Sequence, residues 1–311
     1  MTKYLHICSA AHSGSTLLDM LAGSHSQVAS LGEVNQLSKN IALNSQCGCG
    51  AEIGSCELWS EVIRRVGRQM NIDVLTNPYG LHMGYPLAST VIDKAHQTPA
   101  YLVKRRLVLG LQFLQFRYGL SWLTPLLRPI IQGVDNSVRV FEAVRGVLAV
   151  EAVVDSSKSY LNAIQFYRRY PDRVRIVLLT RDGRGVLWSN MKRGAPRERT
   201  VRDWCNRYNR AIPLLQRYVR REHWLQVRYE DLTSDTAKVL QTVCQLIGLP
   251  FEVGMLQFRQ KKHHIVNGNR IRLSSTSTIA TDVEWMKRLP PEDLQFFEQH
   301  AGTLNRALGY K

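Results

Sequence analysis

The sequence lacks any long uncharged apolar run. Its longest stretch without Asp, Glu, Lys or Arg covers residues 74–92, and this stretch contains Pro78, Gly80 and Pro86. It therefore does not predict a membrane-spanning helix. The first residues have neither a long apolar segment nor a small-residue cleavage site, so we expect no secretory signal. These absences predict a cytoplasmic protein whose six cysteines stay reduced.

Acidic residues are few relative to basic ones. The 311 residues include 41 Lys and Arg against 25 Asp and Glu, which gives a formal net charge of +16. Such a charge attracts anions, so the sequence predicts a phosphorylated, sulfated or acidic partner. A nucleic-acid-binding protein without catalysis is an alternative. The scattered tryptophans do not interleave with the cations as base stacking requires, so we expect no nucleic-acid partner.

Short apolar runs alternate with longer helical patterns along the chain. Strand-like runs cover residues 4–9, 149–154, 174–180 and 224–228, and the first run is followed by a helical pattern over residues 15–24. Because 44% of the residues are hydrophobic, the chain can bury a sizeable core. The alternation predicts an α/β fold: a three-layer α/β/α domain spanning residues 1–311 with a central parallel sheet. Catalytic groups are expected at the carboxyl ends of its strands.

Residues 36–145 interrupt this regular pattern. They contain three cysteines, several prolines and glycines, and an apolar stretch with interspersed arginines over residues 101–131. We interpret residues 36–145 as an inserted cap or acceptor-binding region. The apolar stretch predicts a packed helix pair, with a lipid-facing amphipathic helix as the alternative.

The loop of residues 9–16 joins the first strand to the first helix with mostly small side chains. Backbone N–H groups in such a turn can converge on an anion at the positive end of the helix. Gly14 allows close approach, and Ser15 and Thr16 add hydroxyl donors. The loop lacks the Gly-Lys-Ser/Thr ending of nucleotide triphosphatases. It predicts a P-loop-like phosphate cradle or, alternatively, a tight turn capped by Ser13 or Ser15.

A second anion-binding signal follows the run of residues 174–180. Arg181 comes directly after this run, and Ser189 lies eight residues further along, across a turn and a helix start. Arginine offers a rigid fork of donors that suits a phosphate. Two such elements predict a nucleotide with two separated phosphates. For Arg181 alone, an ion pair with Asp182 is the alternative.

Arginines crowd the segment that follows this second signal. A solvated helix face is the ordinary interpretation of such a run, and a docking site for an acidic or phosphorylated acceptor is the alternative. The residues are Arg197, Arg199, Arg202, Arg207, Arg210, Arg217, Arg220 and Arg221.

Cys47, Cys49 and Cys56 form a C-x-C-x6-C pattern. Thiolates suit zinc, and a histidine from a distant segment could supply a fourth ligand. The paired C-x-x-C spacing of common zinc sites is missing, so the pattern alone favours thiols without a metal.

Together these segments resemble the sulfotransferase family, which uses 3'-phosphoadenosine 5'-phosphosulfate (PAPS) as donor. Residues 12–18 resemble the family's 5'-phosphosulfate loop, and Arg181 with Ser189 resembles its 3'-phosphate pair. Residues 225–251, with Arg-Tyr-Glu-Asp-Leu and Ile-Gly-Leu-Pro-Phe, resemble a further family segment. Residues 264–272 resemble a late basic loop that closes over the 3'-phosphate. The segments occur in the family's order.

The resemblance implies transfer of a sulfuryl group from PAPS to a hydroxyl or amine, leaving 3',5'-adenosine bisphosphate. No metal is required by this scheme. The implied acceptor is a small molecule such as a secondary metabolite, or a glycan, because Cys47–Trp59 and residues 155–158 look like features of bacterial enzymes with such acceptors. A homodimer is compatible with the sequence. The implied donor-binding residues are His12, Ser13, Gly14, Ser15, Thr16, Leu17, Arg181, Ser189, Asn269, Arg270 and Arg272.

Three residues are implied in catalysis. Residues 30–33 resemble the Gly-Glu segment that supplies the catalytic glutamate of protein-tyrosine sulfotransferases and related bacterial enzymes, so Glu33 is the expected general base. Many family members carry Lys or Arg where His12 stands. We expect Lys158 to supply that positive charge, with His12 in a weaker version of the role. Because of this departure, a nucleotide-binding pseudoenzyme is an alternative.

Overall fold

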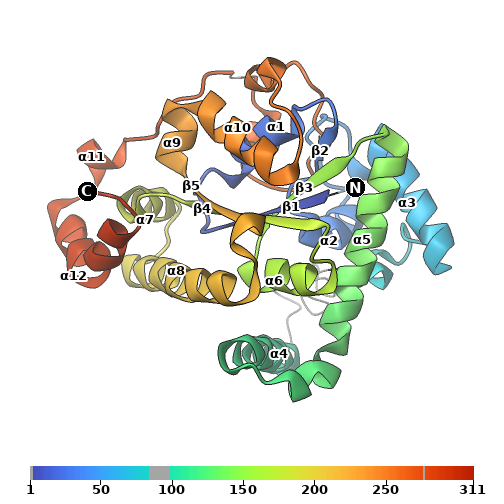
Figure 1. The fold of residues 1–311 in the computed structure, drawn as a ribbon, viewed down its shortest axis with the longest axis horizontal. Coiled ribbons are helices and arrows are strands. Elements are labelled where there is room, and N and C mark those ends of the chain that lie inside the picture. Colours follow the sequence, from blue (N-terminus) through green and yellow to red (C-terminus); the bar gives the residue numbers. More distant parts are fainter. Residues whose placement is uncertain (1–2, 84–98, 276) are drawn as a thin grey trace.

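One parallel sheet organises the chain. The computed structural model describes residues 3–83, 99–275 and 277–311. Five strands form the sheet in the order β2-β3-β1-β4-β5 (Figure 1), and every neighbouring pair is parallel. The strands are β1 (Lys3–Ser9), β2 (Val28–Ser30), β3 (Ala152–Lys158), β4 (Val174–Thr180) and β5 (Trp224–Arg228).

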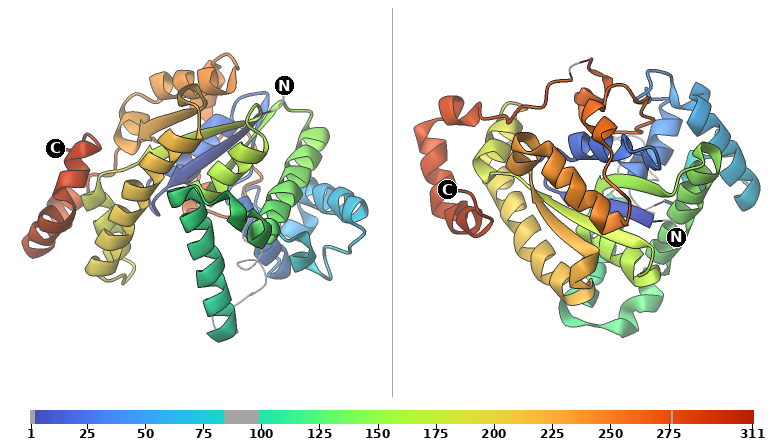
Figure 2. Two further views of the ribbon diagram at one scale, coloured as in Figure 1. Left: turned by 60° about the horizontal axis from the view of Figure 1, so that its bottom comes forward. Right: turned by 45° about the horizontal axis from the view of Figure 1, so that its top comes forward.

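Helices cover both faces of the sheet (Figures 1 and 2). Along β1, Tyr4 and Leu5 point into two different hydrophobic clusters, as alternating strand side chains do. One face is covered by α1 (Ser15–Gly23), α9 (Tyr229–Ser234) and α10 (Thr236–Ile247), and the other by α5 (Arg128–Leu148), α6 (Tyr160–Arg169) and α8 (Arg197–Tyr218). The predicted three-layer α/β/α fold with a central parallel sheet is confirmed.

The remaining helices lie outside these layers. α3 (Glu57–Met70) packs against α5, and α7 (Gly183–Met191) packs against α8, α11 (Trp285–Arg288) and α12 (Pro291–Ala307). The short α2 (Leu37–Ala42) follows β2. Among the described residues, no helix has the length and the apolar character needed to cross a bilayer.

The strand boundaries follow the predicted runs with two differences. The runs at residues 174–180 and 224–228 form β4 and β5 as predicted. β3 covers Ala152–Lys158, whereas the predicted run covers residues 149–154. It begins later because Ala149 adopts the left-handed conformation (φ 52°) that ends α5. β2 was not predicted, since its three residues are too few for a recognisable apolar pattern.

The described residues within 36–145 are mainly helical, apart from an isolated antiparallel β-bridge between Gln46 and Glu52. The apolar stretch at 101–131 becomes α4 (Pro99–Tyr118), the 3-10 helix Ser121–Leu127 and the beginning of α5. Figures 1 and 2 show α4 projecting away from the sheet, whereas α5 runs along the side of the main body. Phe141 of α5 is fully buried against Tyr4 of β1, with ring centroids 5.3 Å apart. The C-terminal part of this region is therefore built into the core. Residues 84–98 of the region lie outside the described residues.

Candidate functional site

A cavity of about 350 Å³ lies at the carboxyl ends of the strands. Each strand leads into one of its lining residues: His12 follows β1, Glu33 follows β2, Lys158 ends β3, Arg181 follows β4 and Tyr229 follows β5. In a parallel sheet these ends share one edge, so the topology collects polar side chains from distant parts of the sequence. The cavity is lined by Ala11, His12, Gly14, Ser15, Thr16, Leu17, Glu33, Lys158, Arg181, Ser189, Lys192, Arg193, Tyr229, Gly268, Asn269, Ile271 and Asp282.

The N-terminus of α1 forms one wall. The first hydrogen bond of the helix runs from Leu18 N to Gly14 O (3.0 Å), so the amides of Ser15, Thr16 and Leu17 have no intrahelical acceptor. These N–H groups and the positive end of the helix dipole favour an anion. Thr16 Oγ1 already accepts a hydrogen bond from Asn269 N (3.0 Å), which ties the late basic loop to this wall.

Three lining residues adopt left-handed backbone conformations. Gly14 has φ 85°, and a Cβ atom there would lie 2.5 Å from Cδ2 of Tyr229, so only glycine fits. His12 (φ 60°) and Lys158 (φ 67°) adopt this conformation although they are not glycines. Such strained residues persist where the surrounding structure holds them, which occurs most often at functional sites.

Arg181 connects three parts of the cavity. The Arg181 residue is 5% exposed, and its guanidinium donates to His12 O (2.8 Å) and to Asp282 Oδ2 (2.9 Å). It also lies over the Tyr229 ring, 4.7 Å from the centroid. Ser189 is likewise buried and lines the same cavity. The predicted pair of Arg181 and Ser189 is therefore brought together beside the first loop.

Glu33 and Lys158 form an ion pair at the opposite side of the cavity from β4. The Lys158 ammonium donates to Glu33 Oε1, and Asn267 Nδ2 donates to Glu33 Oε2 (3.2 Å). Both side chains of the pair are partly exposed to the cavity, Lys158 at 24% and Glu33 at 16%. A carboxylate and an ammonium thus line the same cavity as the N-terminal, positive end of α1.

Asp19 positions the segment that carries Glu33. Its buried Oδ2 atom accepts hydrogen bonds from Gly32 N (2.9 Å) and from Ser156 Oγ (2.6 Å). It therefore fixes the turn before Glu33 to both α1 and β3. Burial raises the pKa of Asp19 to about 8, because desolvation disfavours the charged form.

His12 is uncharged at neutral pH in the unliganded chain. Burial, together with the positive charges of Arg193, Lys158 and Arg181, lowers the pKa of His12 to about 4. The expectation that Lys158 supplies the positive charge of this region, with His12 in a weaker role, stays a prediction.

Most of the predicted site residues meet in this cavity, but three do not line it. Ser13 is fully buried beneath the loop. Arg270 is exposed, and Arg272 Nη1 donates to Gln46 O (2.8 Å). Two cations that the sequence analysis missed, Lys192 and Arg193, line the cavity at the end of α7. They lie nine and ten residues after Gly183, the first residue of α7, and this spacing is not part of a recognisable sequence motif.

Tyr229, Asn267 and Asp282 were also not predicted as site residues. Tyr229 O–H donates to Ala280 O and accepts from Asp282 N, both at 3.3 Å, so it holds the segment that carries Asp282. Tyr229 lies within the Arg-Tyr-Glu-Asp-Leu segment, whose recurrence in the family was the only available signal.

The cavity carries more positive than negative charge and no set of metal ligands. Lys158, Arg181, Lys192 and Arg193 face it, against the carboxylates of Glu33 and Asp282. In the described part of the chain, the group of side chains that could hold a metal ion comprises Cys47, Cys49, Cys56 and His264, none of which lines the cavity. The arrangement therefore suits an anionic ligand, with one carboxylate available to accept a proton.

Comparisons with known proteins identify the fold and the family of this chain. The fold matches the sulfotransferase domain of the olefin synthase from Synechococcus PCC 7002, with a TM-score of 0.53, 19% identity, and coverage of 96% of this chain and 94% of that chain. It also matches the sulfotransferase domain from the curacin biosynthetic pathway, with a TM-score of 0.55, 16% identity, and coverage of 100% and 99%. The comparison with curated proteins gave no match. The model of the sulfotransferase family matches residues 5–253. The chain therefore belongs to the sulfotransferase family.

Proposed function

We propose that this sulfotransferase moves a sulfuryl group from PAPS to a hydroxyl or amine of a small-molecule or glycan acceptor. The observation that carries the proposal is the ion pair of Lys158 with Glu33, which lies beside the free amides of the α1 N-terminus. This arrangement supplies a proton acceptor and a cation at one point of an anion-binding cavity. Such a combination suits a reaction in which negative charge builds up on a departing phosphate.

The two ends of PAPS would occupy two parts of the cavity. The 5'-phosphosulfate would lie on the amides of Ser15, Thr16 and Leu17. The 3'-phosphate would lie against Arg181 and Ser189. Lys192 and Arg193 would add positive charge at the second position, and Asn269 would close the cavity over the first helix.

The proposed transfer is an in-line displacement. The acceptor oxygen or nitrogen attacks the sulfur while the bond from sulfur to the bridging phosphate oxygen breaks, and 3',5'-adenosine bisphosphate leaves. Glu33 takes the acceptor proton, which contributes roughly 100- to 10,000-fold to the rate. When PAPS binds, the Lys158 ammonium would turn from Glu33 to the bridging oxygen, freeing the carboxylate to act as the base. Neutral His12 would donate one ring N–H to the same phosphate.

A second cavity, of about 440 Å³, is our candidate for the acceptor site. Lys158 lines both cavities, so the second one reaches the proposed reaction centre. Its walls combine apolar Phe113 and Leu161 with Arg207 and Arg210. This lining favours an acceptor that has an apolar part and an anionic group. Residues of α4, which belongs to the predicted acceptor-binding region, form part of the wall of this second cavity.

Calorimetry with adenosine 3',5'-bisphosphate tests the donor part of the proposal. Specific one-to-one binding is expected at physiological salt, and absence of binding would reject PAPS as donor. Turnover of radiolabelled PAPS against hydroxylated and amino acceptors, each with and without a carboxylate, then tests catalysis. Binding without turnover across this panel would favour a nucleotide-binding pseudoenzyme.

Gly110 offers a test of the acceptor site that leaves the donor site intact. It lines the second cavity on α4, and a Cβ atom there would meet no other atom within 4 Å. Gly110→Leu should therefore fill the cavity without strain. We expect it to raise the acceptor KM at least tenfold while bisphosphate affinity stays the same. An unchanged KM would place the acceptor elsewhere.

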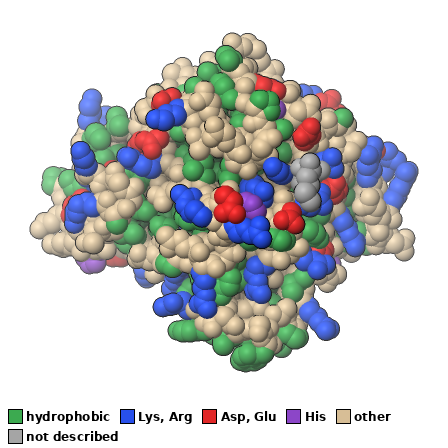
Figure 3. Space-filling view, viewed as in Figure 1, with side chains coloured by type: hydrophobic (Ala, Val, Ile, Leu, Met, Phe, Trp, Pro, Cys, Tyr) green, Lys and Arg blue, Asp and Glu red, His purple; other side chains and the backbone are tan. Residues whose placement is uncertain are grey.

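A nucleic-acid-binding function is the second candidate, and the charge distribution gives it little support. Figure 3 shows Lys and Arg side chains spread over much of the visible face, with acidic side chains between them. Nucleic-acid binders typically gather their cations into a patch or stripe. Binding of a random oligonucleotide in preference to adenosine bisphosphate would reverse this ranking.

A further inference from the structure

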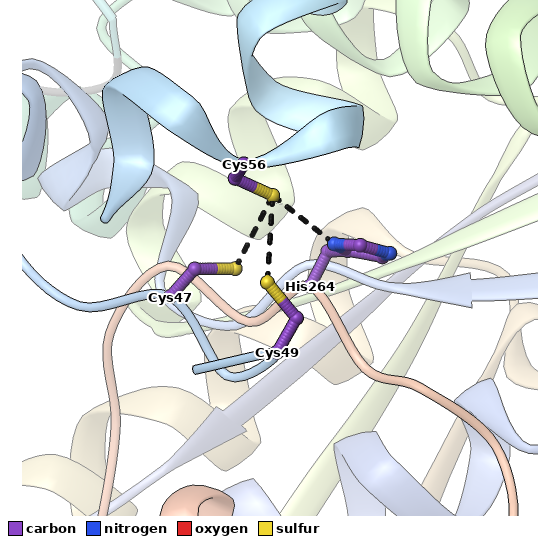
Figure 4. A group of neighbouring side chains, drawn as sticks. All are labelled: Cys47, Cys49, Cys56 and His264. Atoms are coloured by element: carbon purple, nitrogen blue, oxygen red, sulfur yellow. Dashed lines mark hydrogen bonds between the residues drawn. The ribbon is translucent and has the colours of Figure 1, made fainter. Parts of the chain in front are cut away.

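We infer that Cys47, Cys49, Cys56 and His264 form a structural zinc site. Their three sulfur atoms and a ring nitrogen all lie within 4.8 Å of one another. Figure 4 shows the four side chains converging from two separate segments, and His264 is 208 residues from Cys56 in the sequence. The sequence pattern alone favoured thiols without a metal because the paired C-x-x-C spacing is missing, whereas the fold brings a histidine to the three cysteines as a fourth ligand.

The two sulfur–sulfur distances from Cys56 match the edges of a tetrahedron around zinc. Zinc–sulfur bonds of about 2.3 Å place two tetrahedral sulfur ligands about 3.8 Å apart. Cys56 Sγ lies 3.7 Å from Cys47 Sγ and 3.7 Å from Cys49 Sγ. His264 Nδ1 lies 3.1 Å from Cys56 Sγ, and relaxation of a few tenths of an ångström would bring it to the tetrahedral edge of about 3.5 Å.

The second ring nitrogen of His264 has the partner expected for a zinc-bound histidine. His264 Nε2 lies 3.4 Å from Glu57 Oε1. Histidine ligands usually donate their other N–H to a carboxylate or carbonyl, which fixes the ring orientation and the tautomer. Glu57 also accepts from Lys262 Nζ (2.8 Å), so the carboxylate is itself held in place.

The backbone around the cysteines forms a compact, closed turn. Cys47 N donates to Ala51 O (2.8 Å), and Gly50 N donates to Cys47 O (2.9 Å) with Gly50 in the left-handed conformation (φ 93°). Cys47 and Cys56 are fully buried, and His264 is 7% exposed. Four protein ligands leave no open coordination position, which is typical of structural rather than catalytic zinc.

The site would join two segments that the proposed function needs together. Trp59 Nε1 donates to His264 O (2.7 Å), and Gly48 N donates to Ile265 O (2.9 Å). Three and five residues after His264, Asn267 contacts Glu33 and Asn269 contacts Thr16. A metal at the cluster would therefore hold this loop over the cavity. This consequence rests on the proposed function, whereas the metal site itself does not.

Elemental analysis of the full chain, produced in zinc-supplemented medium and purified without a metal-affinity tag, tests the site. We expect one zinc per chain. Cys56→Ser and His264→Ala should each lose it, whereas His264→Cys should retain it as a four-cysteine site. Cys205→Ser is the matched control, because Cys205 lies outside the cluster and contacts His300 O. Cobalt substitution should give thiolate-to-cobalt charge-transfer absorption and tetrahedral ligand-field bands. This experiment uses the parent chain, so it does not depend on whether the variants fold.

Three results would overturn the inference. One is less than about a tenth of a zinc per chain together with no cobalt charge-transfer band. Another is full zinc content in both Cys56→Ser and His264→Ala. The third is a disulfide among Cys47, Cys49 and Cys56 in the native chain, seen as a two-hydrogen mass loss. Because metal content is measured without PAPS, failure of the zinc site and failure of the proposed reaction are distinguishable.

Chelation that removes zinc should also weaken bisphosphate binding severalfold.

Discussion

Replacement of Arg181 by alanine is expected to weaken donor binding without slowing the chemical step. The guanidinium is almost fully buried and aims its donors at the cavity, His12 O and Asp282. Hydrogen bonds to charged groups contribute about 1.5–3 kcal/mol each. Loss of the arginine contact to a phosphate should therefore cost about 2–4 kcal/mol, or roughly 30- to 1,000-fold in affinity. Turnover at saturating PAPS should change little, because the role proposed for Arg181 is to bind the donor and not to take part in the chemical step.

The same substitution removes the ion pair of Arg181 with Asp282, so a second variant separates the two effects. The Asp282 side chain is 39% exposed and can be hydrated when its partner is lost. Asp282→Asn keeps the guanidinium and removes the competing carboxylate, so it should leave bisphosphate affinity unchanged or increase it. Arg199→Ala is the surface control, since the Arg199 side chain is 72% exposed.

Isothermal titration calorimetry with adenosine 3',5'-bisphosphate at fixed ionic strength measures these affinities without an acceptor. Circular dichroism melting confirms that each variant is folded. The reasoning is refuted if Arg181→Ala binds the bisphosphate as tightly as the parent chain. It is also refuted if Asp282→Asn weakens binding as much as Arg181→Ala, because the ion pair and not the phosphate contact would then be responsible.

Three further outcomes are expected. Glu33→Gln should lower kcat by roughly 100- to 10,000-fold while bisphosphate affinity stays within a few fold. Glu61→Gln is the control. If Glu33→Gln turns over labelled PAPS at the rate of the parent chain, Glu33 has no part in the mechanism. Gly14→Ala should lower the free energy of unfolding by about 1–2 kcal/mol or more, because a left-handed alanine costs that much and its Cβ would lie 2.5 Å from Cδ2 of Tyr229. An unchanged midpoint in urea unfolding would contradict this. Asp19 has a folded pKa of about 8 against 3.8 unfolded, so its contribution to stability is lost as the pH rises toward 8. The free energy of unfolding, measured in urea, should therefore fall for the parent by about 2 kcal/mol more than for Asp19→Asn between pH 6 and pH 8. If the difference between the two proteins does not change with pH, Asp19 is ionised in the folded chain.

Much of the cavity was predictable because its residues lie next to strand ends. The run at 174–180 is almost entirely buried, and such a strand reads as a continuous apolar segment. The run at 224–228 is a partly exposed edge strand and gives a shorter signal. Arg181 and the first loop follow recognisable strands, so parallel topology alone brings them together. Glu33 follows a three-residue strand with no pattern of its own, and only the resemblance to the sulfotransferase family pointed to it.

Contacts made by loops could not be predicted in the same way. Asn267 reaches Glu33 across 234 residues, and Lys192 enters the cavity from the far end of α7. The loop at Gly32 packs so closely against the loop at Ile265 that a Cβ atom on Gly32 would lie 2.5 Å from Cγ2 of Ile265. No local spacing in the sequence encodes that approach.

The sequence by itself determined the α/β class, the parallel strands and the positions of the two segments that are predicted to bind anions, because hydrophobic periodicity and turn chemistry are local properties of the chain. Only the tertiary structure decided which polar groups meet. It paired Lys158 with Glu33, turned Arg272 to Gln46 and brought His264 to the three cysteines. These pairings depend on how loops from opposite ends of the chain pack over one edge of the sheet, which is settled by the whole fold rather than by any segment.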